Sequence, residues 1–249
     1  MQELSNWKCR ASAVGRLMTQ KGKLGVGTKT FLQEEYDRIV YGIEPLIFSK
    51  YMKKGTYQEQ DSLALKSRVD GVFYEKNEDS AENEYIKGTP DVILDDCIID
   101  IKSSWDKSTF NKASLKKEYK YQLIVYCWLF HKPKAVLSYC LVNSHPDIID
   151  KEKLALYYKM DKPDTESPEY KAACQQLEMN LIFDFERYKV QHSWYDLETP
   201  PERQRTINER IRVKDFEFKA SSLDDIIENV ELAREYLIEL WKKDIDISK

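Results

Sequence analysis

Residues 88–102, GTPDVILDDCIIDIK, decide how this chain folds. Two short apolar runs, 92–94 and 97–99, flank Asp95-Asp96, a pair suited to a tight turn between strands. A two-residue loop at this turn fixes which residues of the two strands face each other. The resulting pairs are Leu94–Cys97, Ile93–Ile98, Val92–Ile99 and Asp91–Asp100. We therefore expect an antiparallel hairpin with two aspartates facing each other at its open end.

The facing aspartates predict a cation site. Directly opposed residues on antiparallel strands have Cβ atoms about 4.5–5.5 Å apart, so two carboxylates there repel each other. A divalent cation between Asp91 and Asp100 would remove this repulsion, and carboxylates are ligands that Mg²⁺ prefers. Lys102 lies on the same face as Asp100, because side chains alternate along a strand. Lys102 could orient or deprotonate a water, or stabilise charge in a transition state.

Three residues on the neighbouring predicted helices add to this site. Glu59, on the helix before the hairpin, could complete the metal shell. Gln122 and Tyr126 are four apart on the next helix, so both project from one face. Each of these residues alone is more simply explained as a surface or packing residue. The prediction of a site depends on all of them occurring together around the hairpin. Together they suit metal-assisted hydrolysis of a phosphodiester.

The composition indicates a folded protein, and its net charge does not indicate a particular class of binding partner. The 249 residues suffice for one large domain or two small ones. Apolar residues make up 42%, slightly low, and charged residues 33%, which is high. The net charge of −4 gives no overall sign of nucleic-acid binding, although lysines cluster within 21–23, 50–54 and 112–120. Such clusters could contact phosphates, and solvated charged faces are an equally simple interpretation.

Cysteine usage and the N-terminus suggest the compartment. The five cysteines are scattered without any C-x2-C spacing, so neither a zinc site nor an iron–sulfur cluster has support. An odd cysteine count without a secretory signal fits a reducing cytoplasm. No apolar run reaches the length of a membrane span. We expect a soluble cytoplasmic protein with no membrane partner.

Periodicity outlines one mixed α/β domain with a helical C-terminal extension. The expected helices cover 8–20, with Ser12 as N-cap, and 29–41, 46–66, 116–130, 166–190 and 223 to about 243. The expected strands are 84–88, the hairpin, 135–142 and an edge strand at 210–219. Residues 76–84 read as a surface loop and 103–115 as a loop or short helix. Gly55 inside a helix suggests close packing or an approaching partner, although tolerated surface glycines are common.

The order of these residues carries a family resemblance. Glu59, Pro90-Asp91, Asp100-Ile101-Lys102 and Gln122-x3-Tyr126 together resemble the PD-(D/E)xK nuclease superfamily. The chain looks most similar to its phage lambda exonuclease-like and RecB-like (YqaJ-type viral recombinase) branch, strongly over about 50–145 and more faintly at 10–18 and 213–218. The resemblance implies a restriction-endonuclease-like core, a four-stranded mixed sheet flanked by helices. It also implies a single nuclease domain over 1–249, with the core at about 50–145 and a C-terminal extension at about 146–249.

The resemblance also assigns roles to residues. It implies a metal site made by Asp91, Asp100, the carbonyl of Ile101 and, through a second ion or a water, Glu59. Lys102 would be the catalytic lysine, Mg²⁺ the cofactor with Mn²⁺ as a substitute, and no iron–sulfur cluster is expected. Many relatives have Glu where this chain has Asp100, a change the RecB-like branch accepts. The resemblance implies DNA contacts by Gln122 and Tyr126, and by Ser12 and Arg10 at a terminal phosphate. Ser103 is also an expected DNA-binding residue. Independently of the resemblance, Trp105 and Tyr121 could stack on a base or wedge the duplex end, although core packing is the simpler role for either.

The function implied is that of a Mg²⁺-dependent deoxyribonuclease. It would be a 5′–3′ exonuclease acting on linear duplex ends in phage or prophage recombination, beside a single-strand annealing protein, in the cytoplasm of a bacterial or phage-infected cell. It could also form a homo-oligomer. One alternative is an endonuclease or structure-specific nuclease of repair or defence. Another is a non-catalytic DNA-binding protein on a nuclease fold, against which Asp91, Asp100 and Lys102 weigh.

Overall fold

The predicted hairpin is present, in the predicted register. A computed structural model describes residues 1–18, 20, 22–44, 49–184 and 205–247. Strands β4 (Val92–Ile93) and β5 (Cys97–Ser103) are antiparallel, with Val92 opposite Ile99 and Ile93 opposite Ile98. The N–H of Leu94 donates to the carbonyl of Cys97 at 2.8 Å, which closes the two-residue loop. The register on which the candidate site depends is therefore confirmed.

The hairpin belongs to a four-stranded mixed sheet with the order β4-β5-β6-β7. Strand β6 (Lys134–Cys140) runs parallel to β5, and β7 (Ile211–Glu217) runs antiparallel to β6. Parallel neighbours need a crossover, and α7 (Lys117–Leu129) provides it. The four-stranded mixed sheet and the edge position of β7 are confirmed.

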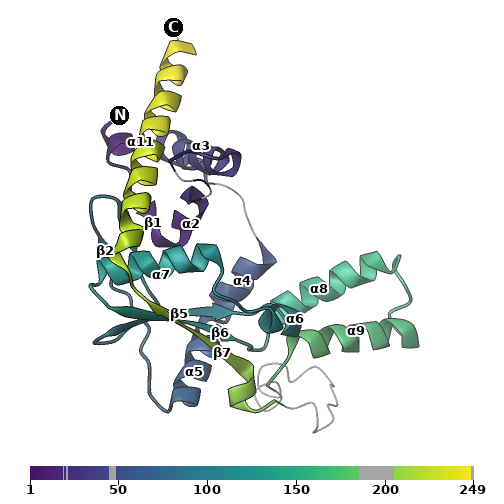
Figure 1. The fold of residues 1–249 in the computed structure, drawn as a ribbon. Coiled ribbons are helices and arrows are strands. Elements are labelled where there is room, and N and C mark those ends of the chain that lie inside the picture. Colours follow the sequence, from purple (N-terminus) through teal and green to yellow (C-terminus); the bar gives the residue numbers. More distant parts are fainter. Residues whose placement is uncertain (19, 21, 45–48, 185–204, 248–249) are drawn as a thin grey trace.

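Helices cover both faces of the sheet (Figure 1). Helix α5 (Glu59–Asp70) packs Leu63 against Val92 and Ile99. On the opposite face, α7 packs Leu123 in the main core with Ile98. Because side chains alternate along β5, Asp100 falls on the α7 face of the strand.

The N-terminal segment corrects a prediction. Residues 8–20 do not form one helix: β1 (Cys9–Arg10) is followed by a 3-10 turn, η1 (Ala11–Ala13), and a short helix, α2 (Val14–Leu17). Strand β1 pairs in parallel with β3 (Ile86–Gly88), which itself pairs with β2 (Ala81–Glu82). This distant strand partner outweighs the local helical pattern. Ser12 consequently lies inside η1 and is not a helix N-cap.

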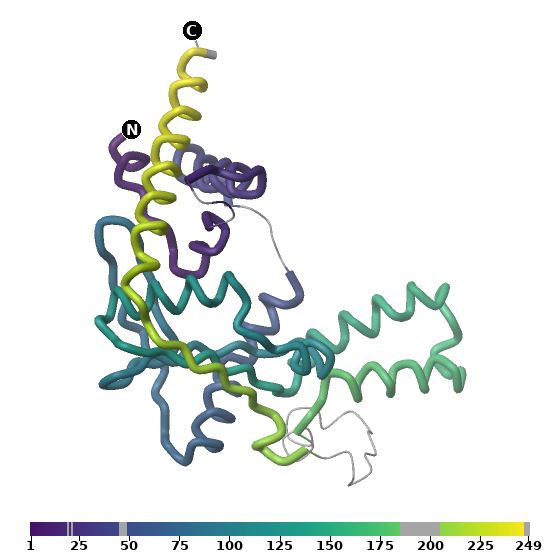
Figure 2. Tube along the Cα trace, in the orientation of Figure 1, coloured from purple at the N-terminus to yellow at the C-terminus, as the bar shows by residue number. Residues whose placement is uncertain are grey.

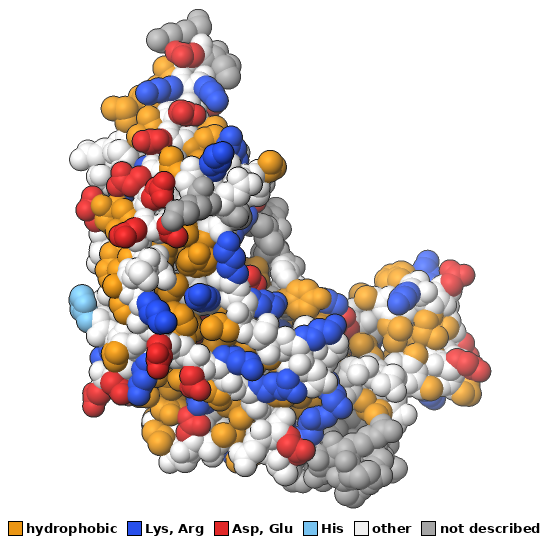
Figure 3. Space-filling model, viewed as in Figure 1, with side chains coloured by type: hydrophobic (Ala, Val, Ile, Leu, Met, Phe, Trp, Pro, Cys, Tyr) orange, Lys and Arg blue, Asp and Glu red, His pale blue; other side chains and the backbone are white. Residues whose placement is uncertain are grey.

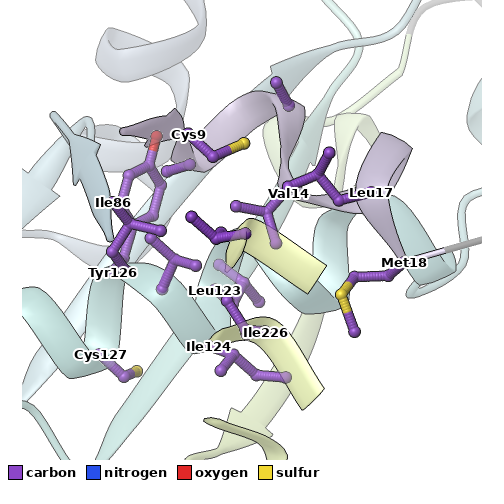
Figure 4. Packing of buried hydrophobic residues seen from close by; sticks show 14 of the residues in the cluster. Cys9, Val14, Leu17, Met18, Ile86, Leu123, Ile124, Tyr126, Cys127 and Ile226 are labelled. Atoms are coloured by element: carbon purple, nitrogen blue, oxygen red, sulfur yellow. The ribbon is translucent and has the colours of Figure 1, made fainter. Parts of the chain in front are cut away.

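The helices at the two ends of the chain pack together above α7. Helices α1 (Gln2–Ser5) and α3 (Val26–Tyr41) lie beside α11 (Leu223–Ile247), and both ends of the chain are on this side (Figure 2). Figure 4 shows Val14 and Leu17 gathered with Leu123 and Ile226 in the main core. The C-terminal helix is confirmed and extends past 243. It follows η4 (Ala220–Ser222).

The predicted helix over 46–66 is two helices. Helix α4 (Lys50–Tyr57) ends at Gln58, whose φ of −104° and ψ of 11° leave helical geometry, and α5 begins at the next residue. A Cβ added to Gly55 would meet nothing within 4 Å, so close packing does not explain this glycine. The start proposed at 46–48 lies outside the described residues.

Two antiparallel helices project from the body as an arm (Figure 1). Helix α8 (Pro146–Lys159) has no counterpart among the predicted elements, whereas α9 (Pro168–Leu181) confirms the first part of the helix expected over 166–190. The prediction is wrong for 182–184, because α9 ends at Leu181 and Ile182 is extended, and its part from 185 lies outside the described residues. The remaining elements are α6 (Lys107–Asn111) and η3 (Ile207–Arg210). Among the described residues, no helix has the length and apolarity needed to cross a bilayer.

One buried lysine predicts a pH effect on stability. Lys54 is 0% exposed, and its ammonium donates to the carbonyl of Trp105 at 2.8 Å. Burial lowers the pKa of Lys54 to about 7. The unfolded chain therefore binds this proton more tightly, so stability rises with pH from about 7 towards the unfolded value of about 10.4. We expect Lys54→Met to raise the free energy of unfolding at pH 7 by about 1–3 kcal/mol and to flatten that rise.

Urea unfolding of both proteins at pH 7 and pH 9 measures this difference. If the free energy of unfolding of the Lys54→Met variant rises with pH as steeply as that of the wild type, groups other than Lys54 cause the pH dependence. A variant less stable at pH 7 would mean that the bond to the Trp105 carbonyl outweighs the cost of burial.

Candidate active site

Asp100 lies at the centre of the candidate site, near the end of β5. It is 2% exposed, and its Oδ1 accepts a hydrogen bond from the Gln122 amide at 3.3 Å. Its Oδ2 lies 2.8 Å from the Lys102 ammonium but accepts no well-directed hydrogen bond. A buried carboxylate oxygen with that one neighbour has an unused lone pair, which suits a further cation.

Asp91 faces Asp100 from the other strand of the hairpin. The register of β4 and β5, continued by one position, places the two aspartates opposite each other. The Asp91 Oδ2 accepts a hydrogen bond from the Ile101 N–H at 2.5 Å, which fixes the carboxylate against β5. Burial, and next the charge of Asp100, raise the pKa of Asp91 above its usual range. Ionisation of Asp91 is therefore disfavoured beside the charge of Asp100.

Lys102 and Tyr126 respond to the same charges. Burial alone would lower the pKa of Lys102, but the nearby charges of Asp100 and Asp91 raise that pKa overall. The lysine is therefore an ammonium ion here. Burial and the charge of Asp100 raise the pKa of Tyr126, which remains a neutral phenol. Its hydroxyl accepts a hydrogen bond from Gln122 at 2.9 Å, so Gln122 links Tyr126 to Asp100.

Glu59 is near the aspartates but is engaged elsewhere. It is the first residue of α5, and its carboxylate forms a 2.8 Å ion pair with Lys76. The charge of Glu59 still reaches Asp91 and contributes to its raised pKa. Within the part of the chain that the structure describes, no three acidic, histidine or cysteine side chains gather closely enough to bind a metal ion together.

The donor set nevertheless fits Mg²⁺. This ion is usually held by one or two carboxylates, with waters and substrate oxygens completing its shell. Asp91 and Asp100 supply two such carboxylates, and a cation would offset the repulsion that disfavours ionisation of Asp91. The structure therefore offers a two-carboxylate site that Glu59 could join only by leaving Lys76.

The N-terminal residues expected at a terminal phosphate lie on the α7 side of the site. A Cβ added to Gly88 would approach Ala11 at 2.8 Å and Tyr126 at 2.9 Å, so η1 sits directly beside Tyr126. Ser12, within η1, is exposed. Arg10 is half-exposed and pairs with the buried Glu35 at 3.1 Å. Their DNA-binding role stays a prediction.

Two further predicted DNA contacts, Ser103 and Trp105, pack against helices α5 and α4. The Ser103 hydroxyl hydrogen-bonds the hydroxyl of Ser62 on α5 at 2.7 Å, on the opposite face of β5 from Lys102. This geometry does not favour a DNA contact by Ser103. Trp105 packs edge-on against Tyr51 of α4, with ring centroids 5.3 Å apart, and is partly exposed.

Two residues that support the site carry no signal in the sequence. Lys76 and Asn77 lie in a segment that reads as a polar surface loop. The N–H of Asn77 donates to the carbonyl of Asp91 at 2.8 Å, and its amide donates to the carbonyl of Pro90 at 2.9 Å. Asn77 thus holds the strand end that carries Asp91, while Lys76 holds Glu59.

The raised pKa of Asp91 predicts a stabilising substitution. The folded state binds the Asp91 proton more tightly than the unfolded chain does, so this stability is lost as pH rises through the folded pKa. An asparagine side chain would carry no charge at any pH and could still accept the Ile101 hydrogen bond. We expect Asp91→Asn to unfold at higher urea concentration than the wild type at pH 8 in EDTA, by about 1 kcal/mol or more.

The advantage of Asp91→Asn should shrink at pH 5 and should reverse when Mg²⁺ is added to both proteins. A variant that is less stable than the wild type in EDTA at pH 8 would show that the two carboxylates are not in conflict.

Known proteins match this chain in structure. No protein-family model matches the chain, and no curated protein sequence matches it. Among solved structures, the chain is similar to a phage-related exonuclease from Haemophilus somnus 129PT, at 22% identity over 98% of this chain and 99% of that one, with a TM-score of 0.70. An alkaline exonuclease from Laribacter hongkongensis matches at 14% identity over 100% of both chains, with a TM-score of 0.58.

The fold is thus that of the phage-type exonucleases. The crystal structure of the Laribacter hongkongensis enzyme with dAMP matches equally well, at a TM-score of 0.58 and 14% identity. These likenesses confirm the fold implied by the PD-(D/E)xK resemblance, a four-stranded mixed sheet flanked by helices with a C-terminal helix.

Proposed function

We propose that this protein is a divalent-metal-dependent nuclease that hydrolyses phosphodiester bonds of DNA. The observation that carries the proposal is the facing pair Asp91–Asp100, with Asp100 buried and the Lys102 ammonium 2.8 Å from it. Its place on a fold shared with two enzymes described as exonucleases supports it further. A structural role explains the pair poorly, because two facing acids held away from water cost stability unless a cation joins them.

Each residue has a task in this proposal. Asp91, Asp100 and the Ile101 carbonyl would hold Mg²⁺, for which Mn²⁺ could substitute, and Glu59 would join directly or through a water. When bound, the ion lowers the pKa of a water and neutralises developing negative charge. Lys102, a fixed ammonium, orients that water or stabilises charge on the phosphate. Gln122 keeps Asp100 oriented through its hydrogen bond.

Exonuclease action at the ends of linear duplex DNA is the finer part of the proposal. Both similar enzymes are described as exonucleases, and one has been crystallised with dAMP. Linear duplex labelled at its 5′ or 3′ end, beside a covalently closed circle of the same sequence, tests this with Mg²⁺ present. Early release of the 5′ label from the linear DNA alone supports a 5′–3′ exonuclease. Cutting of the closed circle would favour an endonuclease instead.

Ser12 provides a separate test of end recognition. If its hydroxyl binds a terminal 5′ phosphate, Ser12→Ala should slow digestion of 5′-phosphorylated duplex several-fold and leave 5′-hydroxyl duplex unchanged. Steady-state rates on the two substrates measure this. Equal slowing on both substrates would mean that Ser12 supports the η1 turn and reads no phosphate.

The biological setting is proposed on resemblance. A recombination exonuclease would work beside a single-strand annealing protein in the cytoplasm of a bacterial or phage-infected cell, and a ring-shaped homo-oligomer would keep it on its DNA. Sedimentation of the purified protein tests the oligomer. A non-catalytic DNA-binding role would be favoured if linear duplex were bound but never cleaved in Mg²⁺ or Mn²⁺.

A further inference from the structure

A basic and aromatic surface lies next to the candidate active site. We define the α4–α8 surface as the exposed side of α4 with the first turns of α8; its residues are Tyr51, Lys53, Tyr57, His145 and Lys151. Tyr51 is 57% exposed and Tyr57 is 41% exposed, unusual values for large aromatic rings. Figure 3 shows lysine and arginine side chains gathered over the middle of the molecule and around the base of the arm.

The α4–α8 surface is held in place by contacts beneath it. The rings of Tyr57 and His145 lie 4.6 Å apart, which joins the end of α4 to the start of α8. In the amide orientation that satisfies both of its polar atoms, Gln58 accepts from the His145 N–H at 3.0 Å and donates to the Lys54 carbonyl at 2.9 Å. The rings are therefore presented by a fixed support, which lowers the entropy cost of binding.

Two lysines on this surface could hold a phosphate. The Lys53 ammonium lies 4.9 Å from the centre of the Tyr57 ring, and Lys151 is exposed on α8 beside Glu152. Lys50 differs, because its ammonium forms a 2.8 Å ion pair with Glu152. An anion bound between Lys53 and Lys151 would be attracted by both ammonium groups.

The surface begins where the active site ends. Tyr57 precedes Glu59 by two residues, and Trp105 follows Lys102 by three. The Tyr51 ring contacts Trp105 edge-on, and the Lys50 ammonium lies 4.6 Å from the centre of the Trp105 ring. Chain neighbours of Glu59 and Lys102 thus join the α4–α8 surface to the candidate site.

We propose that the α4–α8 surface binds one unpaired nucleic-acid strand that leaves or enters the active site. A backbone phosphate would lie between Lys53 and Lys151, with bases against Tyr51 and Tyr57. The inference rests on the proposed nuclease function. A single strand fits better than a duplex, because stacking on a tyrosine needs an unpaired base, whereas duplex binding needs only charge.

Binding without cleavage tests this inference. Fluorescence anisotropy of a labelled oligothymidylate in EDTA, over a series of salt concentrations, compares the wild type with K53Q/K151Q and with Tyr57→Ala. We expect several-fold weaker binding by both variants. For the double variant, the slope of log affinity against log salt should fall by about 1.4, or about 0.7 for each lysine. The single variant K151Q, which keeps the other residues of the surface, should lower the slope by half as much as the double variant.

The matched control is K242Q/K243Q, which removes two exposed lysines at the far end of α11. It should bind the oligonucleotide like the wild type. The inference is overturned if K53Q/K151Q keeps wild-type affinity and slope, or if a duplex of the same length loses as much affinity. Digestion of linear DNA by the wild type is scored separately, so a nuclease that binds through another surface is distinguished from a protein that binds strands but cleaves nothing.

Discussion

Replacing Asp100 with asparagine is expected to lower the rate of DNA hydrolysis by at least about 1000-fold. The substitution keeps the size of the side chain and an oxygen that can accept the Gln122 amide. It removes the negative charge that would bind the cation and that holds the Lys102 ammonium at 2.8 Å. Release of acid-soluble nucleotides from linear duplex in Mg²⁺ measures the effect.

The same hairpin offers a matched control for this substitution. Asp95 is exposed in the turn at the other end of the hairpin, so Asp95→Asn should digest DNA at the wild-type rate. Thermal melts should show that both variants remain folded. If Asp100→Asn digests DNA as fast as the wild type, the catalytic assignment of this site is wrong.

Lys102→Met should have the second-largest effect, a loss of about 100- to 10,000-fold in cleavage with metal binding retained. The ammonium lies 2.8 Å from Asp100, where it neutralises the carboxylate that a metal ion would also bind. Removing it should leave Mn²⁺ affinity equal to or tighter than that of the wild type. Isothermal titration with Mn²⁺, beside the cleavage rate, separates these two effects.

Lys102→Met should also unfold more easily in EDTA, by about 1–3 kcal/mol, because two acids then lack their cation. Added Mg²⁺ should restore most of this stability. Lys243→Met on α11 serves as the control for loss of a lysine charge. Loss of Mn²⁺ binding by Lys102→Met would make Lys102 a structural residue of the site.

The hairpin and its register could be predicted because their determinants are local. Apolar runs of equal length flank Asp95-Asp96, and a two-residue loop leaves one pairing of the strands. That pairing predicts that Asp91 and Asp100 face each other, without information on any tertiary contact. Helix α7 was equally predictable from its periodicity, and with it the common face of Gln122 and Tyr126. The hydrogen bonds from Gln122 to Asp100 and Tyr126 were not predicted and emerge only from the structure.

Other features depend on partners far away in the sequence. Cys9–Arg10 is a strand because β3 lies beside it, and nothing within residues 8–20 indicates that partner. The ion pair of Glu59 with Lys76 joins the first residue of α5 to a segment that follows the end of that helix. Lys54 looks like one more surface lysine of a basic cluster, and only the packing of Trp105 and Phe183 around it reveals its burial.

Ser103 shows a prediction that alternation alone could have improved. Lys102 and Ser103 are adjacent on β5, so their side chains point to opposite faces of the sheet. The hydroxyl of Ser103 accordingly meets Ser62 on α5. Strand geometry thus points the Ser103 side chain away from the face that carries Asp100 and Lys102.

The most direct test of the central claim is the metal dependence of DNA digestion by the unmodified protein. The initial rate of nucleotide release from linear duplex is measured first in EDTA and then over a Mg²⁺ titration. If Asp91 and Asp100 form a metal-dependent nuclease site, release is absent in EDTA and rises to saturation with Mg²⁺. Release that is the same in EDTA and in Mg²⁺, or no release at any Mg²⁺ or Mn²⁺ concentration, would contradict it.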